Sequence, residues 1–430
     1  MVLSLNLGWS TRQVDFSNAF VQADLTEDVF INVPSHFEND DGLTSKDVVL
    51  KLNKSLCGLV QAPMHWFNHL SGILQKKGFK PSNHDQCMFH GRRFIILVCI
   101  DDCLFFGPDE TKIETFIQEL QNDGMSLTKE DDAFHFLGVE VITHDDGRVE
   151  LLQQGLIDKV LKTLGMQDAH SKRTPASNVP LGTDAEGAPF VEDWNCASVV
   201  GMCLHLSSNS RPDIQFAVHQ CARFTHSPKA SHAQAVIKIA RCLAGTKSRG
   251  LTFVPDPNIK LDCCVDADFA GLWKHEDDED PVCVKSRTGF VFTIAGCPVH
   301  WGSKLQMEIA LSTLEAEYIA LSSAMREMLP MRRLFQEIGE KMNLRLKEKG
   351  LLHSTVFEDN NGALGLATAP KMTPRMKHIA VKHHFFKDHI GEENGIRIAK
   401  IETAFQRADI FANGLPFADF ERIRGLLMGW

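Results

Sequence analysis

Short apolar runs and amphipathic patterns alternate along residues 1–150 of the chain. Phe67, Leu70 and Leu74 recur at helical spacing behind Pro63, which predicts a helix that begins near this proline. A second helix is expected over residues 113–124, and strands, four of them in two hairpins, are expected over residues 14–20, 48–52, 87–89, 94–99, 100–106, 134–143 and 148–152. This part of the chain is therefore expected to have mixed α/β structure.

The pattern becomes helical in the middle of the chain and returns to strands in the last part. Helices are expected over residues 154–164, 194–208, 212–224 and 228–243, with a linker rich in Pro, Gly and Ser at 166–191. Strands are then expected over residues 261–265, 288–294, 299–303 and 353–357, with a long helix over 313–338 and further helices in the remainder. Three domains are thus expected, over residues 1–150, 151–255 and 256–430.

Composition excludes several classes of protein. The chain has 430 residues, of which 43% are hydrophobic and 23% charged, as in a globular protein rather than a disordered one. Its longest strictly apolar run, residues 94–100, is far shorter than the roughly 20 residues of a membrane span. The twelve cysteines show no paired CxxC spacing, which argues against structural zinc and favours free thiols in a reducing compartment. No signal peptide is recognisable, so a secreted protein is not expected.

Charge is distributed unevenly along the chain. The formal net charge is −10, which argues against a protein that simply coats nucleic acid. Residues 1–150 have a net charge of −11, residues 151–250 of +4 and residues 251–430 of −3. A basic middle between two acidic flanks indicates three regions with different roles.

Acidic residues stand in or beside five apolar segments, at Asp15, Asp101–Asp102, Asp266–Asp268, Asp359 and Asp409. Burial of an unpaired carboxylate costs several kcal/mol, and a shared divalent cation offsets this cost. Two Mg²⁺ ions about 4 Å apart are a frequent device for phosphoryl transfer on nucleic acid. Taken singly, each Asp is more typical of a turn that faces water, so the residues must be judged as a set.

Several strings of residues, in a fixed order, resemble the polyprotein of copia-type retrotransposons. LNKSLCGLVQAPMHW (residues 52–66), QVDFSNAF, CIDDCLFF and FHFLGVEV resemble segments of its reverse transcriptase. RPDIQFAV and RCLAGT resemble its connection region. VDADFAG, SRTGFVF, STLEAEYIALS, EDNNGAL, MKHIAVKHHFF and FQRADIFANGL resemble its ribonuclease H part. The likeness extends over residues 11–428, and its specificity lies in the joint presence and order of the motifs.

The resemblance implies an α/β (α+β) fold with a reverse-transcriptase palm, a helical thumb/connection and a C-terminal ribonuclease H-like domain. It implies an RNA-directed DNA polymerase that also degrades the RNA of an RNA–DNA hybrid. Asp15, Asp101 and Asp102 match the polymerase carboxylates, of which Asp15 and Asp101 would bind metal. The ribonuclease H carboxylates and metal ligands would be Asp266, Glu317, Asp359 and Asp409. Each site would hold two Mg²⁺ or Mn²⁺ ions.

The resemblance also suggests how substrate is bound. Phe20 matches the aromatic residue that lies under the incoming sugar, although plain core packing explains it equally well. A nucleotide and template pocket is suggested for Gly58, Gln61, Ala62 and Pro63, which could equally be a helix entry built around the proline. The implied partners are an RNA template, a DNA primer, the RNA–DNA hybrid, dNTPs and the rest of the Pol polyprotein, with no membrane. The implied location is a cytoplasmic virus-like particle, with the nucleus as a second compartment.

Local alternatives remain within the ribonuclease H motifs. Asp268 would share a strand face with Asp266, and Glu315 lies two residues before Glu317, so that only one glutamate of this pair can face the site. The motifs favour Asp266 and Glu317. His378 could assist product release, but a polar, hybrid-facing helix end is the stronger reading of Lys377, His378, His383 and His384; a zinc site at these histidines is weaker still.

The sequence also departs from the family pattern. Cys57 and Cys99 stand where the family usually has Tyr, and Asp15 lies close to the start of the chain, whereas the family has a fingers region before this Asp. The sequence is therefore expected to be a fragment whose fingers are largely missing. Two alternatives follow: a truncated chain with ribonuclease H activity only, and a non-enzymatic, decayed or co-opted fragment that binds nucleic acid.

Overall fold

The computed structural model describes residues 1–34, 48–130, 135–273, 283–344, 353–370 and 379–430. The chain forms two compact units. The N-terminal unit comprises residues 7–137 with 337–344, and the C-terminal unit comprises residues 1–6, 138–336 and 345–430. This division differs from the three expected domains, because the middle helices share a unit with the strands of the last part of the chain.

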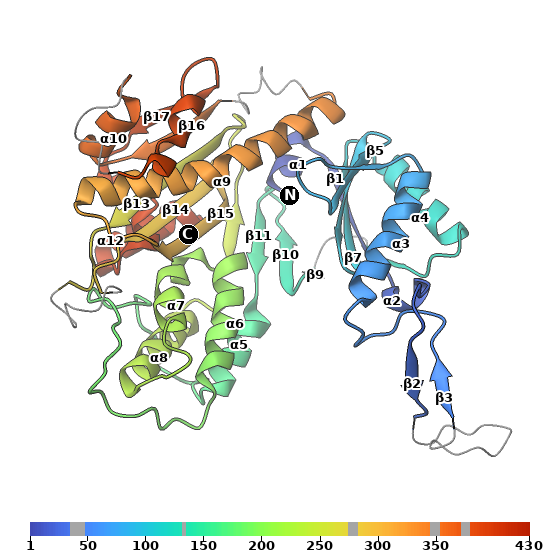
Figure 1. Ribbon diagram of the computed structural model, residues 1–430, viewed down its shortest axis with the longest axis horizontal. Coiled ribbons are helices and arrows are strands. Elements are labelled where there is room, and N and C mark those ends of the chain that lie inside the picture. Colours follow the sequence, from blue (N-terminus) through green and yellow to red (C-terminus); the bar gives the residue numbers. More distant parts are fainter. Residues whose placement is uncertain (35–47, 131–134, 274–282, 345–352, 371–378) are drawn as a thin grey trace. The chain divides into compact units, whose positions relative to one another are not determined.

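A six-stranded sheet with the order β4-β5-β6-β7-β1-β8 forms the centre of the N-terminal unit (Figure 1). Its strands are β1 (Ser10–Asp15), β4 (Lys80–Pro81), β5 (Met88–Gly91), β6 (Phe94–Cys99), β7 (Asp102–Gly107) and β8 (Thr128–Glu130). Helices α3 (Ala62–Lys76) and α4 (Glu110–Asn122) bury apolar residues in the same core as these strands. The expected helices and the hairpin of β5 and β6 are confirmed.

Phenylalanine rings join the sheet to its helices. The ring of Phe79, which follows α3, lies 4.9 Å from Phe94 on β6 and 4.8 Å from Phe116 on α4. All three side chains are buried. Three further elements precede α3: α2 (Ala19–Gln22) and the antiparallel pair β2 (Phe30–Asn32) and β3 (Val49–Lys51). The hydrophobic pattern predicted β3 but not β2.

The middle of the chain forms a helical group in the C-terminal unit. Its helices are α5 (Gln154–Thr163), α6 (Cys196–Asn209), α7 (Gln215–Ala222) and α8 (Ala230–Ala244), which share one hydrophobic core. The antiparallel strands β10 (Val139–Thr143), β11 (Val149–Leu152) and β12 (Leu251–Phe253) flank the group in sequence. The second expected hairpin is therefore present as β10 and β11, whereas β12 was not expected.

A buried ion pair joins two motifs of this helical group. Arg211 donates from Nε and Nη2 to the two carboxylate oxygens of Asp213, at 2.9 and 2.8 Å. Both side chains are 0% exposed. Arg211 Nη2 also donates to the hydroxyl of Thr246 at 2.8 Å. The RPDI and RCLAGT strings therefore meet at one buried guanidinium, which gives both motifs a structural role.

A five-stranded sheet with the order β15-β14-β13-β16-β17 completes the C-terminal unit. Its strands are β13 (Leu261–Asp268), β14 (Arg287–Ile294), β15 (Cys297–Leu305), β16 (Ser354–Glu358) and β17 (Ile396–Lys400). β14 is antiparallel to β13 and β15, whereas β13, β16 and β17 are parallel. The strand β17 corrects the expectation that only helices follow β16.

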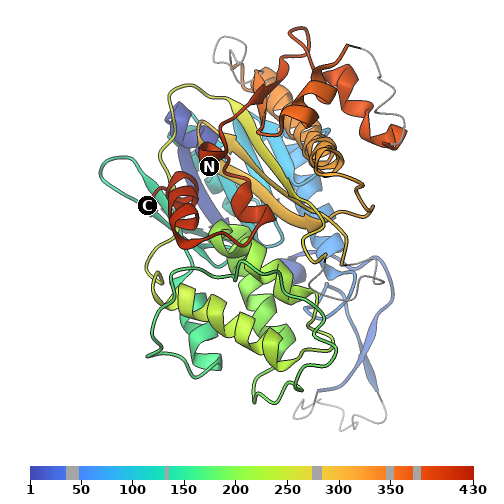
Figure 2. The same cartoon turned by 90° about the vertical axis from the view of Figure 1, so that its left-hand side faces the viewer.

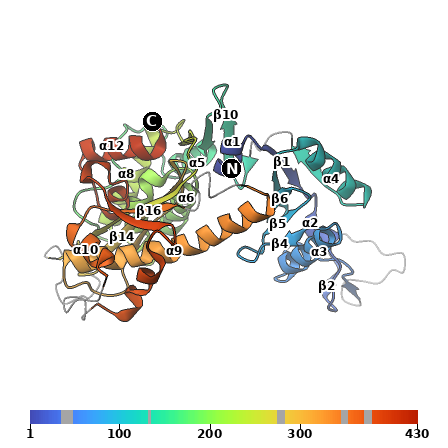
Figure 3. The ribbon, with the colours of Figure 1, turned by 90° about the horizontal axis from the view of Figure 1, so that it is seen from above.

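Helices cover both faces of this sheet. The 29-residue helix α9 (Thr313–Lys341) lies on one face, and α11 (Asp409–Ala412) and α12 (Phe417–Met428) lie on the other (Figures 2 and 3). At Gly289 on β14 an added Cβ would lie 2.7 Å from the Ala408 carbonyl oxygen and 2.8 Å from the Ala412 amide nitrogen. Glycine thus allows the backbone around α11 to approach the sheet closely, which places Asp409 near β13.

Candidate active sites

Two groups of carboxylates lie at strand ends, one in each unit. In the N-terminal unit, Asp15 ends β1 and Asp102 begins β7, and these two residues are paired in the antiparallel register. Ile100 has the left-handed backbone angle φ of 56°, which turns the chain sharply between β6 and β7. Asp101 lies in this turn, and its carbonyl accepts a hydrogen bond from the Phe16 amide at 2.9 Å.

The turn therefore places Asp15, Asp101 and Asp102 at the same end of the sheet. Among the described residues these three do not form a group close enough to share one cation, so their binding of metal stays a prediction. Burial, and then the charge of Asp101, raise the pKa of the Asp15 carboxyl. Like-charged carboxylates at a strand end repel each other, and a divalent cation would relieve this repulsion.

Two residues that the motifs did not single out, Trp66 and Gln13, contact the turn and the strand that follows it. Trp66 on α3 donates from Nε1 to the Ile100 carbonyl at 2.5 Å, and its ring packs edge-on against Phe16 at 5.2 Å. Gln13 donates from Nε2 to Asp102 Oδ1 at 3.3 Å. Trp66 lies within one of the strings that carried the resemblance, but its contact with the turn spans 34 positions, which local spacing cannot reveal.

The substitution Trp66→Phe tests whether the hydrogen bond from Trp66 to the Ile100 carbonyl stabilises the turn. It should keep the aromatic packing on Phe16 but remove the donor to the Ile100 carbonyl. We expect the free energy of unfolding of the N-terminal unit to fall by about 1–3 kcal/mol, measured by urea denaturation followed by circular dichroism. Phe67→Leu, on the same helix but away from the turn, is the matched control for altered aromatic packing. Equal stability of Trp66→Phe and the wild type would show that the turn does not need this bond.

The residues expected to bind nucleotide and template surround the start of α3. Ala62 is buried, and Pro63 occupies the first turn of the helix after Gln61. Gly58 has a φ of +101°, which side-chain-bearing residues rarely adopt. Phe20 lies on the short helix α2, not on the expected strand, and packs partly buried against the hydrophobic core. These positions fit the helix-entry and core-packing readings; their contact with nucleotide stays a prediction.

The second carboxylate group lies in the C-terminal unit. Asp266 comes from β13, Glu317 from the start of α9, and Asp359 directly follows β16. One oxygen of each carboxylate lies within 4.8 Å of the others. Because β13 and β16 are parallel neighbours, their carboxyl ends meet at the same edge of the sheet. This topology unites residues that are far apart in the sequence.

Asp409, the first residue of α11, adds a fourth charge to this group. Burial is the main cause that raises the pKa of Asp266, and the charge of Asp409 is the next. The side-chain amide of Asn413 donates a hydrogen bond from Nδ2 to Asp266 Oδ2 at 3.3 Å. The Thr403 hydroxyl donates to Asp359 Oδ2 at 2.8 Å. The four predicted carboxylates are therefore neighbours, and two of them are oriented by polar side chains.

The two local alternatives are directed elsewhere. Asp268 Oδ1 accepts a hydrogen bond from the Arg287 amide at 2.9 Å, within the pairing of β13 and β14. Glu315 Oε2 accepts from the Leu311 amide at 2.9 Å, just before α9. Both carboxylates thus serve local backbone groups, which leaves Asp266 and Glu317 to form the cluster.

The histidines do not form the expected exposed surface. His383 and His384 are buried, so the reading of these two residues as a hybrid-facing helix end is wrong. His383 Nε2 lies 3.0 Å from Glu308 Oε2, and His384 Nδ1 lies 2.8 Å from the hydroxyl of Tyr318. Each imidazole ring therefore has a polar partner within the C-terminal unit. Lys377 and His378 lie outside the described residues.

The carboxylate cluster has the chemistry of a divalent-cation site. Glu317 Oε2 is buried and has no hydrogen-bond partner among the described residues. Carboxylate oxygens are the donors that Mg²⁺ and Mn²⁺ prefer. Burial, followed by neighbouring carboxylates, raises the pKa of Glu317 and of Asp409. The residues present therefore fit a bound cation, which would compensate for the charges gathered here.

The stability of the C-terminal unit should depend on pH when divalent cations are removed. A carboxyl whose pKa is higher in the folded than in the unfolded state gives stability that is complete below the unfolded value of about 4 and is lost as pH rises. In EDTA, we expect the Tm of the wild-type chain to fall as pH rises from about 4 to 8. This fall should exceed that of an Asp266→Asn variant, which lacks one of the buried carboxylates, by roughly 5 °C. Differential scanning calorimetry measures this difference. If the difference in Tm between the wild type and Asp266→Asn does not change with pH, the carboxylates of the cluster do not repel one another.

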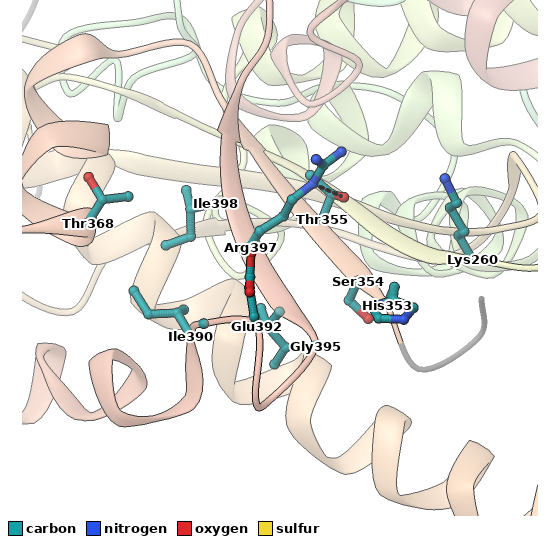
Figure 4. Close-up of a pocket in the computed structure, with 12 residues that line it drawn as sticks. Lys260, His353, Ser354, Thr355, Thr368, Ile390, Glu392, Gly395, Arg397 and Ile398 are labelled. Carbon is teal, nitrogen blue, oxygen red and sulfur yellow. Dashed lines mark hydrogen bonds between the residues drawn. The ribbon is translucent and has the colours of Figure 1, made fainter. Parts of the chain in front are cut away.

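A pocket of about 690 Å³ occupies the other end of the same sheet (Figure 4). It is lined by the beginnings of β16 and β17, including Ser354 and Arg397, and by Lys260 before β13. None of the predicted carboxylates lines it. This pocket is thus separate from both candidate sites.

Sequence comparison identifies proteins related to this chain. Residues 1–178 match the family model described as reverse transcriptase (RNA-dependent DNA polymerase). The chain is 31% identical over 97% of its length to the retrovirus-related Pol polyprotein from transposon RE1 of Arabidopsis thaliana, and 32% identical over 99% to that from transposon TNT 1-94 of Nicotiana tabacum. It is 22% identical over 97% of its length to the transposon Ty1-DR6 Gag-Pol polyprotein of Saccharomyces cerevisiae.

The class of protein follows from these matches: the chain contains a reverse transcriptase domain. More particularly, it belongs to the Pol polyproteins of copia-type retrotransposons. It spans 27%, 31% and 24% of the length of the three relatives named above. No helix among the described residues is long and apolar enough to cross a membrane.

Proposed function

We propose that this chain is an RNA-directed DNA polymerase with ribonuclease H activity, which uses two divalent cations at each site. The observation that carries the ribonuclease H assignment is the convergence of Asp266, Glu317 and Asp359. Buried carboxylates with an unpartnered oxygen at the edge of a sheet are costly for the fold alone. Their cost is explained if they bind cations for phosphoryl transfer on an RNA–DNA hybrid.

The carboxylates and their polar neighbours would have different roles in cleavage of the hybrid. Asp266, Glu317, Asp359 and Asp409 would hold two Mg²⁺ or Mn²⁺ ions. When bound, such ions would generate the attacking hydroxide and neutralise charge on the phosphate and the leaving oxygen. Thr403 and Asn413 would fix the orientation of Asp359 and Asp266 through the hydrogen bonds described above.

The polymerase assignment rests on the family match and on the turn at Asp101. Asp15 and Asp101 would hold the cations of this site, with Asp102 in support, and Phe20 would lie under the sugar of the incoming dNTP. Gly58, Gln61, Ala62 and Pro63 would shape the nucleotide and template pocket. In this proposal residues 1–150 are the palm, 151–255 the thumb and connection, and 256–430 the ribonuclease H-like domain.

One experiment separates this proposal from its alternatives. The purified chain with Mg²⁺ is given a labelled RNA–DNA hybrid and, separately, a primed RNA template with dNTPs. We expect both hybrid cleavage and primer extension. Asp15→Asn should remove extension and leave cleavage, since the two carboxylate groups belong to different units.

Each outcome has a distinct meaning. Cleavage without extension by the wild-type chain would support a truncated enzyme with ribonuclease H activity only. Binding of the hybrid with neither reaction would support the non-enzymatic alternative. Extension without cleavage would overturn the ribonuclease H assignment and leave the polymerase one.

A further inference from the structure

A fifth carboxylate, Glu358, lies beside the cluster of the C-terminal unit. Glu358 is the last residue of β16 and is 0% exposed. The parallel register pairs Phe357 with Cys264 of β13, so the next positions along the two strands are Glu358 and Val265, one residue before Asp266. The side chain is therefore buried where the two strands of the cluster end.

Among the residues that the structure describes, only one oxygen of this carboxylate has a hydrogen-bond partner. Glu358 Oε1 accepts a hydrogen bond from the Asn360 amide at 2.9 Å. Oε2 is buried and has no hydrogen-bond partner among the described residues, as is also true of Glu317 Oε2. Buried polar atoms are almost always satisfied in folded proteins, so two unpartnered carboxylate oxygens in one cluster call for a ligand.

Electrostatics connects the two glutamates. The charge of Glu358 acts on both Glu317 and Asp266, where it adds to the effect of burial on their pKa values. Glu358 therefore lies near Glu317 and Asp266, beside the three carboxylates whose oxygens lie within 4.8 Å of one another.

We propose that Glu358 is a fifth acidic residue of the metal centre, and that its free oxygen helps to hold a divalent cation beside Glu317. This inference rests on the proposed ribonuclease H function. It assigns a role in cation binding to a residue that the sequence motifs did not single out. Asn360, which also caps helix α10 (Asn361–Thr368), would fix the other oxygen of Glu358.

The matched variant is Glu358→Gln. Glutamine can keep the bond from the Asn360 amide, and it replaces only the free oxygen. Asp262→Asn is the control, because Asp262 is a partly buried carboxylate of the neighbouring strand β13 and, like Glu358, accepts a backbone hydrogen bond, from the Thr355 amide at 2.8 Å. Asp262 lies at the other end of the strand, near the pocket and away from the cluster.

Mn²⁺ binding to the full chain provides the test, measured by electron paramagnetic resonance. A background of Asp15→Asn and Asp101→Asn removes the candidate site of the N-terminal unit. We expect Glu358→Gln to weaken Mn²⁺ binding about 10-fold or more and Asp262→Asn to leave it unchanged. In EDTA, Glu358→Gln should be at least as stable as the background, because it removes a buried like charge; this thermal unfolding measurement shows that the variant is folded.

The outcomes distinguish this inference from the proposed function. If the background chain binds no Mn²⁺, or if Asp359→Asn does not weaken binding, the proposed metal centre itself is wrong. If Asp359→Asn weakens binding and Glu358→Gln does not, only the role of Glu358 is overturned. Equal weakening by Asp262→Asn would indicate a general effect of buried charge and would also overturn it.

Discussion

Asp359→Asn should lower the rate of RNA–DNA hybrid cleavage by about 10³-fold, a loss of about 4 kcal/mol of transition-state stabilisation. Asparagine has the same shape and can keep the hydrogen bond from the Thr403 hydroxyl, but it removes a negative charge from the cluster. The measurement is single-turnover cleavage of a labelled hybrid at saturating Mg²⁺. Circular dichroism establishes that the variant is folded.

Asp268→Asn is the control for this prediction. Asp268 is an aspartate of the same strand as Asp266, but its Oδ1 accepts from the Arg287 amide, outside the cluster. Asparagine can keep that bond, so cleavage should stay within a few-fold of the wild type. If Asp268→Asn abolishes cleavage while Asp359→Asn retains it, the cluster has been assigned to the wrong carboxylates.

Arg211→Met should destabilise the C-terminal unit by about 3–5 kcal/mol. The substitution keeps much of the apolar length of the side chain but leaves the carboxylate of Asp213 buried, at 0% exposure, without its cation. The Thr246 hydroxyl would also lose its donor. Urea denaturation followed by circular dichroism measures the shift.

The double variant Arg211→Met, Asp213→Leu separates loss of the pair from loss of packing. It removes both charges, so most of the stability should return. A single variant as stable as the wild type would show that Asp213 is neutral or finds another partner. A double variant no better than the single one would place the cost in packing around Trp430, whose ring lies 5.8 Å from the Arg211 guanidinium.

Much of the fold could be predicted from hydrophobic periodicity, because α3, α4 and the central strands of both sheets carry regular apolar patterns. The short strands β2, β12 and β17 were missed: β2 and β17 bury few of their residues, and β12 alternates regularly but has only three residues, too few for a periodic pattern to be recognised. The division into two compact units depends on packing between the middle helices and the last strands, which no local pattern encodes.

The candidate sites were predictable from the order of motifs, not from any single residue. Asp266, Glu317 and Asp359 converge as expected, because parallel strands bring their ends together. Glu358 and Trp66 could not be identified in this way. The contact of Trp66 with the turn joins positions far apart in the chain. Glu358, beside Asp359, is in the sequence indistinguishable from an ordinary residue at a strand end or turn.

Tyr318 has a practical consequence for chemical labelling. It is the single tyrosine of the chain, it is 0% exposed, and its hydroxyl meets His384 inside the C-terminal unit. Nitration, iodination or enzymatic phosphorylation of tyrosine therefore has one possible target, and the native fold conceals it. Modification of this residue would report the opening of the unit that holds the carboxylate cluster, with no background from any other tyrosine.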